Sequence, residues 1–219
     1  MSIMEVEANR EVAGAHEVIE QSRERITAID DEVAQLLVER HATVQAIALA
    51  RRVAGEPLYS AREQQATVND FTSAAEEHGI DRDMARRDII HPLVEAENKV
   101  TVSLAGMAAY EGEDTSDVIA EGLRRKTEID LQLIMLIAQR KAVAEAIGEA
   151  KKVLGLGIYN EARELEVIDR FIDTTVQGGV SRQLSYGIIT RLIQESRSAQ
   201  SVVLSGGEMS ATQAEAIAQ

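Results

Sequence analysis

Residues 22–52 read SRERITAIDDEVAQLLVERHATVQAIALARR, and residues 123–152 read LRRKTEIDLQLIMLIAQRKAVAEAIGEAKK. The two stretches match at a spacing of 100 residues, so that Ile29 aligns with Ile129. Self-similarity at a fixed spacing indicates that one structural unit occurs twice in the chain. We therefore expect two copies of the same unit, each built around a long helix.

One face of each long helix is apolar and is interrupted by two cations. Positions that step by three or four residues share one face of a helix. In the two copies these positions hold Ile29, Val33, Leu36, Arg40, Val44, Ile47 and Arg51, and Ile129, Leu133, Leu136, Arg140, Ala144, Ile147 and Lys151. A buried cation without a partner is strongly unfavourable, so each one needs an anion or must reach solvent. The anion can be an acidic side chain of the same chain or a bound dianion, and the repetition of the pattern favours the ligand.

The composition restricts the kind of protein. Of 219 residues, 45% are hydrophobic and 27% charged, which is ordinary for a soluble globular fold. The formal net charge of −14 argues against binding to nucleic acid or to an anionic membrane surface. Cysteine is absent and the four histidines are scattered, so we predict neither a disulfide nor a metal site. No stretch resembles a secretory signal or a membrane span, which predicts a cytoplasmic protein.

Caps and breakers predict the same order of three helices twice, and no segment alternates as a strand does, so we predict an all-α fold. The helices are expected at about residues 16–53, 60–77, 82–104, 116–154, 160–177 and 182–204. Ser60 and Asp81 are the expected N-caps of the second and third helices. Pro92 lies inside the third helix and should kink it or remove a hydrogen bond.

The repeats also define the domain organisation. We assign residues 1–104 to the first repeat, 105–116 to a linker, 117–204 to the second repeat and 205–219 to a disordered tail. Small and polar residues dominate the tail, which is typical of disorder. Residues 1–14 are expected to fray or to extend the first helix weakly.

The order of charged and polar motifs resembles that of the all-helical chorismate mutases. In the second half, the long helix is followed by YNEARE at residues 159–164 and by a helix that carries Ser196 and Gln200. The resemblance covers both repeats and rests on the ordered set, because no single motif is specific. It implies that the repeats interlock as a pseudo-dimer within one chain, and further pairing of chains stays open. In that family each site takes most of its residues from one chain and one arginine from the partner.

Combining the two halves by this rule gives one complete site. Its residues are Arg23 from the first repeat and, from the second, Arg140, Lys151, Asn160, Arg163, Glu164, Ser196 and Gln200. The resemblance implies that the three arginines and Ser196 bind the substrate carboxylates, and that Lys151 and Gln200 donate to the ether oxygen. Glu164, with the region of Asn160, would accept from or orient the ring hydroxyl. Asn160 departs from the aspartate that is usual there.

The opposite combination of halves gives a degenerate site. Leu123 stands at the position of the partner arginine, Arg51 at that of the lysine, and the pair Arg62-Glu63 comes one residue early. For the serine and the glutamine, the third helix offers either Ala96 and Val100 or Glu97 and Thr101, depending on register. We therefore expect one working site per chain.

Three arginines remain in the degenerate half, namely Arg40, Arg51 and Arg62. A cluster of this kind suits an anion. We predict that the degenerate site binds an anionic effector such as an aromatic amino acid.

The predicted function is the rearrangement of chorismate, a small dianion, to prephenate by electrostatic stabilisation. The reaction is intramolecular, so no cofactor is expected. Isochorismate-pyruvate lyase and aminodeoxychorismate mutase act on near-identical dianions, and Asn160 leaves both open as alternatives. A different class is a non-catalytic regulatory protein that binds a partner, but a complete set of site residues argues against it.

Overall fold

The structure is a computed structural model that describes residues 3–58, 60–105 and 115–206. The described residues form helices and turns with no strand, which confirms the all-α prediction. The elements are α1 (Ile3–Val53), α2 (Ala61–Glu77), α3 (Arg82–Met84), η1 (Ala85–Ile90), α4 (His91–Ala105), α5 (Ser116–Leu154), α6 (Glu161–Gln177) and α7 (Arg182–Leu204). None of the helices in these ranges is long and apolar enough to cross a membrane.

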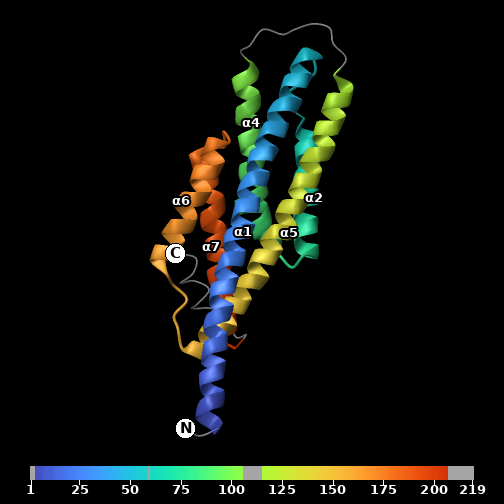
Figure 1. The fold of residues 1–219 in the computed structure, drawn as a ribbon. Coiled ribbons are helices and arrows are strands. Elements are labelled where there is room, and N and C mark those ends of the chain that lie inside the picture. The colour runs from blue at the N-terminus through green and yellow to red at the C-terminus, as the bar shows by residue number, and fades with distance from the viewer. Residues whose placement is uncertain (1–2, 59, 106–114, 207–219) are drawn as a thin grey trace.

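The two long helices α1 and α5 run antiparallel, side by side, through the middle of the molecule (Figure 1). The apolar stripes meet between them, and Ile29 and Ile129 are completely buried there. Each repeat reaches across this axis, because α2 packs against α5 and α6 packs against α1. The third segments pack on their own long helices, α4 on α1 and α7 on α5. The two repeats therefore interlock, as the resemblance implied.

The loops after the long helices are built alike in both repeats. Gly55 and Gly155 follow the helix ends with φ of 71° and 63°, a left-handed conformation that glycine adopts without strain. The side chains of Ser60 and Asn160 then accept hydrogen bonds from the backbone three residues on and start α2 and α6. The predicted caps Ser60 and Asp81 are confirmed.

Pro92 is preceded by a π-helical turn, η1, whereas the matching residues 185–190 of the second repeat are regular α-helix. Proline has no amide hydrogen to donate to the previous turn, so a wider turn is accommodated there at little cost. The turn absorbs one additional residue and shifts the register of α4 relative to α7. As a result Glu97 and Ser196 occupy equivalent positions: Glu97 contacts Arg40, and Ser196 contacts the matching Arg140.

Helix α1 is longer than predicted, because it begins at Ile3 rather than near residue 16. Ala15 and Ile19 pack against Ala150 at the end of α5, and this contact stabilises a segment that contains no proline. Most of the predicted linker and nearly all of the predicted tail lie outside the described residues.

Candidate functional site

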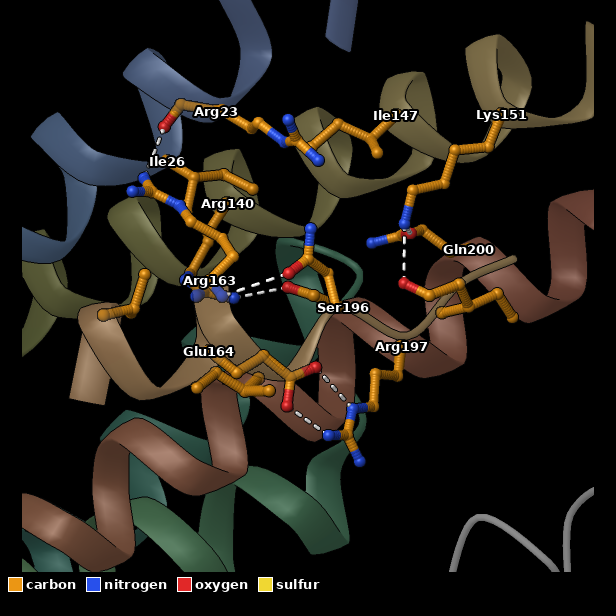
Figure 2. Close-up of a pocket in the computed structure, with 14 residues that line it drawn as sticks. Arg23, Ile26, Arg140, Ile147, Lys151, Arg163, Glu164, Ser196, Arg197 and Gln200 are labelled. Carbon is orange, nitrogen blue, oxygen red and sulfur yellow. Dashed lines mark hydrogen bonds and ion pairs between the residues drawn. The ribbon is translucent and has the colours of Figure 1, made fainter. Parts of the chain in front are cut away.

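A pocket between the repeats brings all eight predicted site residues together (Figure 2). It encloses about 620 Å³, open mouth included. Besides the eight, its lining consists of Ile26, Ile147, Ile158, Val167, Ile193 and Arg197. Aliphatic walls with a few converging charges are typical of a ligand site.

Helix geometry explains why these residues meet. Arg140 and Lys151 are eleven residues apart on α5, which is close to three turns, so both face the same way. Arg163 and Glu164 lie in the first turn of α6, after its N-cap. Helix α7 supplies the serine and the glutamine one turn apart, and Arg23 comes from α1 of the other repeat.

Arg140 is held rigidly by groups of both repeats. Its Nε and Nη2 donate to the two carboxylate oxygens of Asp30, at 2.7 and 3.2 Å, across the repeat boundary. Its Nη1 donates to the Leu192 carbonyl at 2.7 Å and to the hydroxyl of Ser196. The sequence left open whether the cations on the apolar face pair with an acidic side chain or with a bound dianion. For Arg140 the partner is an acidic side chain, Asp30. Asp30 follows the aligned Ile29, and sequence reasoning gave it no role.

Lys151 differs from the other cations of the stripe because no carboxylate of the described residues forms an ion pair with it. It is 7% exposed, and its Nζ donates to the Ile158 carbonyl at 2.6 Å and to Oε1 of Gln200 at 2.9 Å. Burial, and then the positive charge of Arg23, lower the pKa of Lys151, and Glu164 opposes this shift. A buried cation with only neutral partners is the group that a bound anion stabilises most.

Gln200 is oriented by this lysine. Because an ammonium group only donates, the amide oxygen of Gln200 faces Nζ, and the amide NH₂ remains to donate elsewhere. Lys151 and Gln200 therefore present two donors close together on the pocket wall (Figure 2).

Arg163 and Arg23 are anchored less tightly. The Arg163 Nη2 donates to the hydroxyl of Thr27 and to the Arg23 carbonyl at 3.4 Å, so α6 is tied to α1. The Arg23 guanidinium pairs with the exposed Glu20, at 2.6 Å, and with no other acidic side chain of the described residues. Asn160 caps α6, since its Oδ1 accepts from the backbone NH of Arg163 at 3.1 Å. Its side-chain oxygen is therefore engaged by the helix.

Glu164 is held by a residue that sequence reasoning missed. The Nε of Arg197 donates to its Oε1 at 2.8 Å, and Nη2 donates to its Oε2. The Arg197 guanidinium also lies over the ring of Tyr159, 4.8 Å from its centroid. The position of Arg197, one residue after Ser196 and three before Gln200, was the available signal.

A second pocket is the counterpart from the opposite combination of halves and encloses about 430 Å³. Leu123 lines it at the place of Arg23. Glu97 occupies the place of Ser196, with its carboxylate 2.6 Å from Nη2 of Arg40 and 3.4 Å from Nζ of Lys126. Arg40 also donates to Asp130 at 2.6 Å. Burial acts to lower the pKa of Arg40, but Asp130 and Glu97 together raise it.

The three arginines of the predicted effector site are not gathered in this pocket. Arg51 lines it but donates to both oxygens of Glu63, at 2.8 and 2.7 Å. Arg40 has the two carboxylate partners given above, and Arg62 is exposed outside the lining. Anionic effector binding stays a prediction, and the cations it would use are already paired with acidic side chains.

Both repeats match a known family. The family model described as Chorismate mutase type II matches residues 22–97 and 123–201, more than half of the chain. A chorismate mutase of Methanocaldococcus jannaschii is 29% identical over 82 residues, which is 37% of this chain and 83% of that protein. No solved structure gives a significant match. The chain therefore belongs to the chorismate mutase type II family, whose unit it contains twice.

Proposed function

We propose that the chain is a chorismate mutase, an isomerase that converts chorismate to prephenate in one site per chain. The site consists of Arg23 from the first repeat and the seven predicted residues of the second. The observation that carries the proposal is Lys151, a buried cation with neutral partners, beside three arginines in a pocket with aliphatic walls. Such a pocket suits a small anion, and chorismate is a small dianion.

The arrangement suits an intramolecular rearrangement. In this reaction the ether C–O bond breaks while a C–C bond forms, so the protein needs to supply neither a nucleophile nor a proton. Guanidinium groups bind carboxylates as a fork, and Arg23, Arg140 and Arg163 would hold the two carboxylates in a compact conformer. Lys151 and the NH₂ of Gln200 would donate to the ether oxygen as negative charge develops on it.

The degenerate pocket supports the limit of one site. There the carboxylate of Glu97 contacts Arg40 and Lys126, as a ligand carboxylate would, and Glu63 neutralises Arg51. A dianion would have to displace these ion pairs without any gain in charge neutralisation. We therefore expect one chorismate molecule per chain.

Arg23→Ala tests the enzyme and the interlocked architecture together. We expect kcat/KM for chorismate to fall about 10- to 100-fold, mainly through KM, because a charge-assisted contact to a carboxylate is lost. The loss of chorismate absorbance in wild type and variant measures this. Leu123→Ala, at the matching position of the other repeat, is the control and should change kcat/KM less than twofold.

Two results would contradict the proposal in different ways. An Arg23→Ala protein whose kcat/KM stays within twofold of wild type would show that the site does not cross the repeats. A wild type that leaves chorismate unchanged but releases pyruvate from isochorismate would replace the proposed reaction with the lyase reaction.

The pH dependence should report Lys151. A charged donor is needed, so kcat/KM should fall as pH rises through the lowered pKa of Lys151, below the ordinary value of 10.5. A bound dianion stabilises the ammonium form, so the fall in kcat should occur at higher pH than the fall in kcat/KM. Steady-state kinetics across pH 7 to 11 measure both. A kcat/KM profile that stays flat up to the ordinary lysine pKa would remove Lys151 from this role.

A further inference from the structure

The contact between Glu164 and Arg197 has a neutral equivalent in the other repeat. Gln64 of α2 occupies the position that Glu164 occupies in α6. Because of the one-residue shift at η1, Asn98 of α4 occupies the position that Arg197 occupies in α7. There the Nε2 of Gln64 donates to Oδ1 of Asn98 at 2.7 Å. The second and third helical segments of each repeat are therefore joined at the same point, by two amides in one repeat and by an ion pair in the other.

This comparison separates what the fold needs from what the pocket uses. A pair of amides is sufficient to join the two segments, so a charged pair is not required for packing. The charged pair occurs in the repeat that supplies most of the complete pocket. Glu164 is also the only acidic residue among the described residues that line the pocket.

We propose that Arg197 is a positioning residue that orients Glu164, cancels its charge and thereby makes this side of the pocket select a neutral hydroxyl over an ammonium group. The proposal rests on the proposed function, in which Glu164 accepts a hydrogen bond from the ring hydroxyl of the substrate. The fork engages one lone pair on each oxygen of Glu164, which leaves further acceptor positions for that hydroxyl.

The selectivity follows from the charges. A carboxylate alone would attract an ammonium group at the ring position more strongly than a hydroxyl. Arg197 donates to both oxygens of Glu164, so a substrate group that contacts Glu164 also lies close to the Arg197 guanidinium. An ammonium group at this ring position would be repelled by that guanidinium. The ring of Tyr159 contacts the Arg197 guanidinium, which helps to hold it against Glu164 (Figure 2 shows the fork). A hydroxyl carries no charge, so the Arg197 guanidinium does not weaken its binding.

A double-mutant cycle tests this. The variants are Arg197→Asn, Glu164→Gln and their combination, which installs the amide chemistry of the first repeat. Each is assayed with chorismate and with aminodeoxychorismate, in which an amino group replaces the hydroxyl. We expect Arg197→Asn to lower kcat/KM for chorismate about tenfold and to lower the preference for the hydroxyl compound at least tenfold. In the Glu164→Gln background, Arg197→Asn should change both quantities less than twofold.

Two controls separate this role from a structural one. The double variant should unfold within a few degrees of wild type, since the first repeat folds with the same pair. Gln64→Glu with Asn98→Arg, which installs the ion pair in the degenerate half, should leave kcat/KM unchanged.

Additive effects in the cycle, or an unchanged preference in Arg197→Asn, would overturn the inference. If wild type converts neither compound, the proposed function fails. Calorimetric affinities of the two compounds for wild type and Arg197→Asn then still measure the discrimination. Equal affinity ratios in the two proteins would overturn the inference by itself.

Discussion

Lys151→Ala is expected to lower kcat/KM for chorismate by about 10²–10³, the usual cost of one donor to a developing oxyanion. The loss should appear mainly in kcat, because the ether oxygen becomes strongly negative only in the transition state. The same substitution removes a buried cation whose partners among the described residues are neutral oxygens. The free energy of unfolding should therefore stay constant or rise, as measured by urea denaturation.

The matched control for this variant is Arg51→Ala, at the same position of the first repeat. Arg51 is neutralised by the half-exposed Glu63, so its loss should leave kcat/KM within twofold of wild type. A Lys151→Ala protein with full activity and intact unfolding behaviour would contradict the catalytic assignment. A variant that loses activity only because it unfolds is recognised by its denaturation curve.

The fold and most of the pocket could be predicted from the sequence because both depend on periodicity. A stripe at helical spacing identifies a buried face, and its recurrence 100 residues later identifies the interlocking partner. The side chains of Arg140 and Lys151 are one example, since their spacing alone places them on one face. All eight predicted residues consequently lie around one pocket.

What could not be predicted depends on contacts between segments. Asp30 is the partner of Arg140 because the packing of α1 against α5 brings these two residues next to each other. Arg197 reaches Glu164 because α6 and α7 pack together. The choice between Ala96 and Glu97 depended on where one additional residue of the first repeat is absorbed. The π-helical turn before Pro92 makes that choice, and sequence alone did not reveal it.

Glu97→Ala should have the largest effect on stability, about 3–5 kcal/mol in the free energy of unfolding. Among the described residues, the substitution leaves Lys126 with the hydroxyl of Thr67, at 3.4 Å, and leaves Arg40 with the carboxylate of Asp130. Ser196→Ala, at the matching place of the other repeat, removes no charge and should cost about 1 kcal/mol. Denaturation of both variants measures the difference, and equal losses would contradict the ion-pair argument.

The same variant tests whether Glu97 replaces a ligand carboxylate. If it does, removing its side chain exposes an anion site between Arg40 and Lys126. A small dicarboxylate should then raise the unfolding temperature of Glu97→Ala with increasing concentration, because a ligand that binds only the folded state stabilises it. The reference is the shift that the same ligand produces in wild type through the complete pocket. Equal shifts in the two proteins would mean that no second site has opened and that Glu97 does not take the place of a ligand carboxylate.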